Sequence, residues 1–200
     1  IQVFRNVCAL RIKEEGKIML YGALEAGGTK MICGICKENG EIVEQTSIPT
    51  KTPDETIPKI IDFFRDKGIV ALGIACFGPI DLHPSSETYG YITSTPKIAW
   101  QNYPIVPVIR KALSIPIGFD TDVNGSLLGE VSYGSSRGIE NAVYITIGTG
   151  IGGGVLSNGK LLHGMLHPEL GHMALVPHEK DHFGGNCPFH KNCFEGMASG

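Results

Sequence analysis

Residues 142–154 read AVYITIGTGIGGG, an apolar run followed by five glycines within seven positions. The apolar run predicts a strand, and we expect a glycine loop over residues 148–154 and a return strand over residues 155–162. Glycine costs about 0.5–1 kcal/mol relative to alanine in a regular element, so five of them indicate a functional reason. Close approach of backbone N–H groups to phosphates is such a reason. We predict phosphate contacts from Gly148, Thr149, Gly150 and Gly152.

Two better-known phosphate motifs do not fit this stretch. Gly148, Gly150 and Gly153 form a G-x-G-x-x-G pattern, and Glu169 lies near the distance that a dinucleotide fold requires. That motif opens a helix, whereas residues 155–160 are typical of a strand and a turn. The sequence also contains no G-x-x-x-x-G-K-[ST] motif, which excludes a P-loop enzyme.

A second glycine turn, EAGGTK, spans residues 25–30 between expected strands at 20–24 and 31–36. Gly27 and Gly28 allow a tight turn and close approach to a ligand. Thr29 adds a hydroxyl group and Lys30 a positive charge. An ordinary hairpin turn remains the alternative, but two glycine loops in one chain favour a nucleotide whose phosphates are held from both sides.

The rest of the pattern predicts an α/β fold of two related domains with a cleft between them. Short turns join a third strand to the first two, which indicates an antiparallel meander. We expect residues 19–122 to form the first domain, residues 123–200 an unfinished second domain, and residues 1–18 an extension outside the fold. The expected later elements are a strand at 42–48, a helix from 53 to Gly68, a strand at 69–77, a helix at 104–113 with Ala112 inward, a strand at 115–119 and a helix at 123–133.

A carboxylate follows the strand at residues 115–119. Asp122 precedes a helix, which places it at the edge of the predicted cleft. A kinase needs a base that accepts the proton of the attacking hydroxyl and orients that hydroxyl. The alternative is that Asp122 has only a structural role as the N-cap of the helix. Asp120, two residues earlier, is the rival base.

Cysteine and histidine gather near the end of the chain, in Cys187-x2-His190-x2-Cys193, and His172 can supply a fourth ligand. Two thiolates and two imidazoles suit tetrahedral zinc, and four protein ligands make the metal structural. Glu169 and His172, three residues apart, offer acceptors for sugar hydroxyls, and Glu195 offers a third; a surface charge is the alternative for each. Other histidines lack metal-ligand spacing, namely His83, His163, His167, His178 and His182.

Composition narrows the class of protein. About 42% of the 200 residues are apolar and the formal net charge is −3, with Lys and Arg scattered rather than clustered. We therefore expect no nucleic-acid partner. No apolar run approaches the roughly 18–20 residues that span a membrane, and no signal peptide is evident. We expect a cytoplasmic protein whose six cysteines are reduced.

Taken together, these motifs resemble the ROK family of sugar kinases, and within it the zinc-containing fructokinases. The resemblance runs from about Leu20 to Gly200 and includes STPK at residues 94–97 and WQN at residues 100–102. It implies an actin-like ATPase fold of two ribonuclease-H-like lobes, the second of them truncated. It also implies Asp122 as the base, ATP held with Mg²⁺ by the glycine loops, and a homodimer. The sugar-binding residues that we expect are Asn102, Glu169, His172 and Glu195.

The implied reaction is conversion of D-fructose to D-fructose 6-phosphate. Kinases of mannose, glucose or N-acetylhexosamine remain alternatives, as does a non-catalytic sugar-binding regulator of the same family. One departure is Thr121, because the family usually has Asn before the base. The family's chain also continues for roughly another hundred residues, which provide the wall around adenosine.

Overall fold

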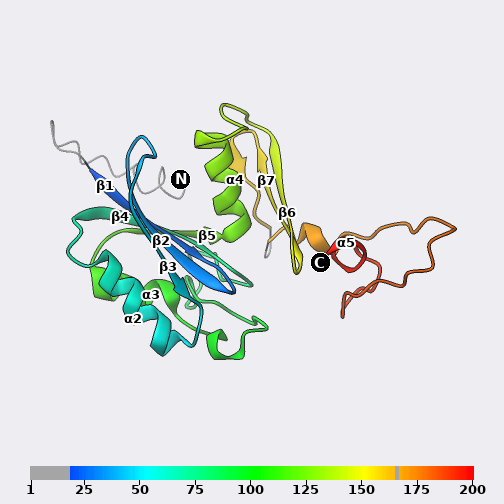
Figure 1. Ribbon diagram of the computed structural model, residues 1–200, viewed down its shortest axis with the longest axis horizontal. Coiled ribbons are helices and arrows are strands. Elements are labelled where there is room, and N and C mark those ends of the chain that lie inside the picture. Colours follow the sequence, from blue (N-terminus) through cyan, green and yellow to red (C-terminus); the bar gives the residue numbers. More distant parts are fainter. Residues whose placement is uncertain (1–18, 165–166) are drawn as a thin grey trace.

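The computed structural model describes residues 19–164 and 167–200, and the expected extension at residues 1–18 lies outside this part. The described residues form two sheets, one of five strands and one of three. Figure 1 shows them side by side, joined through α4, with a long arm ahead of the C-terminal helix. No helix in the described part has the length and apolar character needed to span a membrane.

The first sheet has the strand order β3-β2-β1-β4-β5. Antiparallel pairing joins β1, β2 and β3, as the meander predicted, whereas β4 and β5 run parallel to β1. The elements of this half are β1 (Leu20–Ala26), β2 (Lys30–Lys37), β3 (Ile42–Pro49), α2 (Pro53–Phe64), β4 (Ile69–Cys76), η1 (Ile98–Trp100), α3 (Ile105–Leu113) and β5 (Ile117–Thr121).

Both α2 and α3 cover one face of this sheet (Figure 1). Alternation along β1 sends Leu24 and Ala26 into this covered face, and both are buried. Apolar side chains at helical spacing pack against this face from the helices, including Ile57, Ile60 and Phe64 of α2. The apolar core formed here fixes the strand ends from which the candidate site is built.

Helix α4 (Asp122–Tyr133) begins where β5 ends and packs against the second sheet. Its N-cap is Thr121, whose hydroxyl accepts the N–H of Asn124 at 3.2 Å. Threonine and asparagine both serve as N-cap residues, so Thr121 keeps the capping role that the family's usual Asn could also fill.

The second sheet has the order β6-β7-β8 and is antiparallel. A tight turn with positive φ at Asn158 and Gly159 joins β7 to β8, as expected for a two-residue hairpin. The elements are β6 (Ala142–Ile147), β7 (Ile151–Ser157), β8 (Lys160–Leu161), η2 (Leu170–His172) and α5 (Phe194–Ala198).

The expected glycine loop at residues 148–154 is wrong in extent, because β7 begins at Ile151. Gly152, Gly153 and Gly154 are strand residues. A methyl group added to Gly152 would lie 3.0 Å from Val123 Cγ1, one on Gly153 would overlap Leu170 Cδ1, and one on Gly154 would lie 2.9 Å from the Val123 carbonyl oxygen. These glycines therefore allow β7 to pack closely on α4 and η2, a reason that the composition did not reveal.

Two smaller boundaries and the exposure of one residue also differ. The strand expected from Ile115 begins at Ile117, after Pro116, which has no N–H to donate to a sheet. Helix α2 ends at Phe64, before Gly68. In α3, Ala112 is exposed.

Candidate active site and metal-ligand cluster

The carboxyl ends of three parallel strands meet at one edge of the first sheet. Ala26, Cys76 and Thr121 pair in register across β1, β4 and β5. The residues that follow β1 and β5 are Gly27 and Asp122. Two strand spacings amount to about 10 Å, so the sheet brings the first glycine turn and the candidate base to the same edge.

Hydrogen bonds of Gly27 hold the first glycine turn in place, whereas the next two residues leave their backbone N–H groups unused in the described part of the chain. Gly27 donates its N–H to the carbonyl oxygen of Lys30 at 3.1 Å, and the Thr50 hydroxyl donates to the Gly27 carbonyl at 2.7 Å. Within the described residues, the N–H groups of Gly28 and Thr29 donate no hydrogen bond. Two unused donors on a turn form the kind of concave backbone that binds anions.

Asp122 is half-buried at the first position of α4. Its Oδ1 accepts the N–H of Val123 at 2.9 Å. Burial raises the pKa of Asp122, the nearby charge of Glu25 raises it further, and backbone donors and His167 act in the opposite direction. A carboxylate with a raised pKa accepts a proton more readily, which suits a general base.

Asp120, the rival base, is buried and already bound. Its Oδ1 accepts the N–H of Thr121 and the side-chain amide of Asn124, each at 2.8 Å. Its Oδ2 lies 2.9 Å from His163 Nε2. With both oxygens engaged, Asp120 is suited to holding the start of α4 in place, and Asp122 is the better placed candidate.

The second glycine turn is attached to the C-terminal helix. Gly148 donates its N–H to the Gly150 carbonyl at 2.9 Å, and its own carbonyl accepts from Gly200 at 2.7 Å. Glu195 Oε2 accepts the N–H of Ile151 at 3.0 Å. Glu195, expected at a sugar, therefore lies against this turn with one carboxylate oxygen already engaged.

The predicted metal ligands come together in space. One ligand atom from each of His172, Cys187, His190 and Cys193 lies within 4.8 Å of the others. His172 Nδ1 lies 3.7 Å from Cys193 Sγ and 3.8 Å from Cys187 Sγ. Tetrahedral zinc with ordinary bond lengths separates such atoms by about 3.4–3.8 Å, so the donor set fits this metal in both chemistry and spacing.

The short helices η2 and α5 pack against β7 and position the remaining candidate sugar-binding residues. Glu169 precedes η2 in a left-handed conformation, and its carbonyl accepts the N–H of His172 at 2.9 Å. Gly171 packs so closely on β7 that a methyl group there would overlap the Ile151 carbonyl. Glu169, His172, Glu195 and the second glycine turn thus form one group. Asn102 lies in the first half, exposed, in a turn after η1.

Two histidines that the sequence analysis set aside take part in this region. His167 Nε2 accepts the N–H of Ile80 at 3.3 Å, which ties the segment before Glu169 to the first half. Burial lowers the pKa of His167, whereas hydrogen bonding to Asp120 raises the pKa of His163. Their partners lie 87 and 43 residues away in sequence, so no local spacing could have indicated these contacts.

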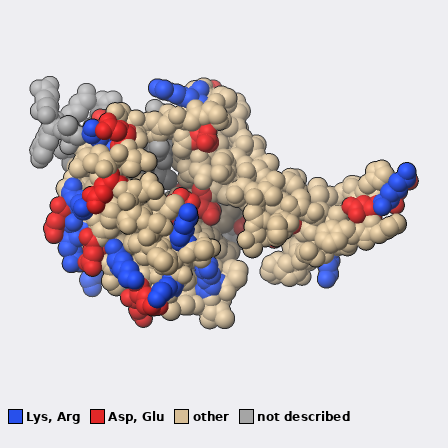
Figure 2. Space-filling view, in the orientation of Figure 1, with Lys and Arg blue, Asp and Glu red and all other residues tan. Residues whose placement is uncertain are grey.

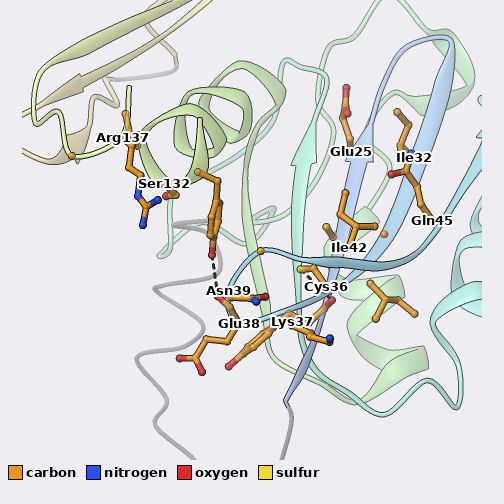
Figure 3. A pocket seen from close by; sticks show the side chains of 18 of the residues that line it. Glu25, Ile32, Cys36, Lys37, Glu38, Asn39, Ile42, Gln45, Ser132 and Arg137 are labelled. Carbon is orange, nitrogen blue, oxygen red and sulfur yellow. Dashed lines mark hydrogen bonds between the residues drawn. The ribbon is translucent and has the colours of Figure 1, made fainter. Parts of the chain in front are cut away.

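A separate cavity of about 980 Å³ lies on the sheet face opposite α2 and α3. Figure 3 shows Ser132 and Arg137 on one side of it and Lys37, Asn39 and Ile42 on the other. None of the predicted site residues lines it. Figure 2 shows acidic and basic side chains intermixed over the first half, with no large patch of one sign on the face of the molecule that is turned to the viewer.

Comparison with known proteins decides the family. The model of the ROK family matches residues 21–200. The chain belongs to the ROK family. It is 48% identical over 181 residues to a putative fructokinase of Bacillus subtilis and 49% identical over 181 residues to a fructokinase of Lactococcus lactis subsp. cremoris. These alignments cover 90% of this chain and 60% and 61% of the two relatives, so the chain spans about three fifths of their length.

A solved ROK structure shows the same fold. The ROK hexokinase of Thermus thermophilus superposes with a TM-score of 0.72 at 29% identity, covering 91% of this chain and 61% of that protein. The expectation of an α/β, actin-like fold of the ROK type is confirmed. The expected domain boundaries at residues 19–122 and 123–200 stay a prediction.

Proposed function

We propose that the full-length protein containing this chain is an ATP-dependent hexose kinase that converts D-fructose to D-fructose 6-phosphate. The observation that carries the proposal is the position of Asp122, at the head of α4 and on the same sheet edge as the open glycine turn at residues 27–29. The preference for fructose rests on 48–49% identity to relatives named as fructokinases, against 29% to a ROK hexokinase.

In this proposal the two glycine turns bind the phosphates of ATP, which such enzymes take as a magnesium complex. The first turn contributes Gly27, Gly28, Thr29 and Lys30, and the second contributes Gly148, Thr149, Gly150 and Gly152. Gly152 is supported less well than the others, since its position in β7 already has a packing reason.

The reaction itself needs one proton transfer from the chain. Asp122 accepts the proton of the primary hydroxyl while that oxygen bonds to the γ-phosphorus and the bond to the β-phosphate oxygen breaks. The phosphorylated sugar and ADP leave, and Asp122 then gives its proton to water. The raised pKa of Asp122 assists the first step, because it increases the affinity of the carboxylate for the proton.

Sugar hydroxyls are proposed to meet Asn102, Glu169, His172 and Glu195. His172 directs Nδ1 toward the two thiols, which leaves Nε2 for a hydroxyl group. Glu195 retains Oε1 for the same purpose. The segment that carries His172 and Glu195 would therefore bind sugar only while the metal-ligand cluster keeps its shape.

The metal proposed for His172, Cys187, His190 and Cys193 is zinc. With four protein ligands it would crosslink η2 to the residues before α5 and would not act on the substrate. A homodimer, implied by the family resemblance, stays a prediction that light scattering can measure.

The hexose panel is the first experiment. Full-length protein, ATP and Mg²⁺ are assayed with fructose, mannose, glucose and N-acetylhexosamines by following ADP release. The proposal expects kcat/KM to be highest for fructose. A higher value for another hexose would correct the substrate, and no ADP release with any sugar, although sugar still binds, would favour a regulator.

Substitution of the two carboxylates tests the base. We expect Asp122→Asn to lower kcat by roughly 10²–10⁴-fold, the usual range for a lost general base, while fructose binding and melting temperature hardly change. In Asp120→Asn, the matched control, we expect the larger loss of stability, since this residue is buried with three partners. Full turnover in Asp122→Asn would move the base elsewhere.

A further inference from the structure

A half-buried lysine from a different segment lies over the first glycine turn. Lys97 precedes η1, and a methyl group placed on Gly28 would lie 3.0 Å from Lys97 Cε and 3.9 Å from its Nζ. The ammonium group therefore lies near Gly28, whose N–H group, like that of Thr29, donates no hydrogen bond in the described residues. Any side chain at position 28 would compete with Lys97 for this space.

The backbone that carries Lys97 is fastened to the same turn. The N–H of Trp100 bonds to the Lys97 carbonyl at 2.8 Å, and the Trp100 indole N–H donates to the carbonyl of Lys51 at 2.7 Å. The residue before Lys51, Thr50, holds Gly27 through its hydroxyl. Trp100 is fully buried, with Phe77 and Tyr103 against its ring. Lys97 is thus positioned by the core.

Lys97 also lacks a counter-ion among the described residues. Some other lysines of the first half pair with carboxylates, as Lys37 does with Glu41 and Lys51 with Glu55. Over residues 19–164 and 167–200, no carboxylate oxygen lies within salt-bridge distance of Lys97 Nζ. Because this half-buried side chain lies against Gly28, whose N–H group donates no hydrogen bond in the described residues, the arrangement indicates an anionic ligand.

We propose that Lys97 binds the phosphoryl group that is transferred, together with the N–H groups of Gly28 and Thr29. This inference rests on the proposed kinase function and adds a residue to it. The transferred group carries its charge on three outer oxygens in the transition state, and a fixed ammonium stabilises that charge. The shared ligand chemistry is a terminal phosphoryl group, present on the nucleotide before transfer and on the sugar afterwards.

Kinetics of full-length variants give the first test. We expect Lys97→Met, which keeps the chain length and loses the charge, to lower kcat/KM for ATP by roughly 10²–10³-fold, as loss of one charge-stabilising donor does elsewhere. Lys97→Arg should recover part of the activity. Lys51→Met is the matched control, since it removes a nearby exposed charge that pairs with Glu55, and it should behave as the unsubstituted protein. Equal activity in Lys97→Met and Lys51→Met would overturn the proposal.

Binding measurements separate the two sources of phosphoryl group and do not depend on turnover. Calorimetry would compare a non-hydrolysable ATP analogue, ADP, tripolyphosphate and fructose 6-phosphate, and thermal denaturation would check that each variant is folded. Weaker binding of the ATP analogue but not of ADP assigns Lys97 to the γ-phosphate, and weaker binding of fructose 6-phosphate assigns it to the product. Folded Lys97→Met that binds all four ligands normally would contradict the inference.

The same measurements distinguish failure of this inference from failure of the kinase proposal. If the unsubstituted protein phosphorylates no hexose but binds tripolyphosphate in a manner that Lys97→Met loses, the phosphoryl site stands and the kinase proposal falls. If the unsubstituted protein is an active kinase and Lys97→Met is equally active, the kinase proposal stands and the role of Lys97 falls.

Discussion

Residues 19–121 and residues 122–200 bury very different amounts of apolar surface. The first region has a continuous core between its sheet and two helices, with Ile74, Phe64 and Trp100 each almost fully inaccessible. In the second region few large apolar side chains are buried, among them Leu127, Leu128 and Leu156. Figure 2 shows charged side chains gathered mostly over the first region on the visible face.

The second region replaces side-chain burial with close backbone packing and with a ligand cluster. Gly152, Gly153 and Gly154 bring β7 against α4 and η2, and the two cysteines of the cluster are buried. The stability of the second region should therefore depend on a few contacts, whereas that of the first region is spread over many. The predictions below therefore separate the two regions, from the largest expected effect to the smallest.

Loss of the metal should have the largest effect and should be confined to the second region. We expect Cys187→Ser to lose bound zinc and to expose residues 167–200, because structural zinc contributes on the order of 10 kcal/mol to folding of its site. Hydrogen exchange and metal analysis check this, with Cys36→Ser in β2 as the control. Protection should persist in residues 19–121. A metal-free variant with unchanged exchange would contradict the proposed crosslink.

Gly154→Ala should destabilise the packing of α4 on β7 by roughly 1–3 kcal/mol, the usual cost of overpacking. The added carbon would lie 2.8 Å from Asn124 Oδ1 and 2.9 Å from the Val123 carbonyl. Gly148→Ala is the control, since no atom lies within 4 Å of an added carbon there. Denaturant unfolding should leave Gly148→Ala near the unsubstituted protein, while its KM for ATP rises. If Gly154→Ala kept its stability but raised the KM for ATP, and Gly148→Ala lost stability, phosphate binding would again be the better explanation for the five glycines.

The smallest effect is a pH dependence at the junction of the two regions. Asp120 raises the pKa of His163 in the folded protein, so folding favours the protonated ring. The resulting stability is fully present below the ordinary histidine pKa and is lost as pH rises through the raised value. Melting temperatures of the unsubstituted protein and His163→Asn should therefore differ at about pH 5.5 and converge by about pH 8.5. A constant difference would mean that the contact does not depend on charge.

Much of the first region could be predicted from the sequence, because its elements have strong periodic patterns. The strand expected from residue 20 and the helix expected from residue 53 begin where the structure has β1 and α2. In the second region, the turn expected within residues 155–160 lies at Asn158 and Gly159. The metal-ligand cluster was equally predictable, since three of its ligands lie within seven residues.

The failures have a common physical cause, which is that they depend on contacts between distant residues. Glycine in a strand cannot be told from glycine in a loop until the packing of β7 on α4 is known. The bond from Ile80 to His167 and the position of Lys97 over Gly28 likewise join segments that are far apart in the chain. The sequence indicates Lys97 only as part of the STPK motif, and the absence of a carboxylate beside it among the described residues is visible only in three dimensions.

The outward face of β6 has a practical consequence. Val143, Ile145 and Ile147 alternate along this strand and are each at least 45% exposed, and β6 is the end strand in the order β6-β7-β8. An end strand with an apolar face is a template for pairing with other chains. When residues 1–200 are produced alone, self-association should increase with concentration, and a lysine at position 145 should keep the preparation monodisperse.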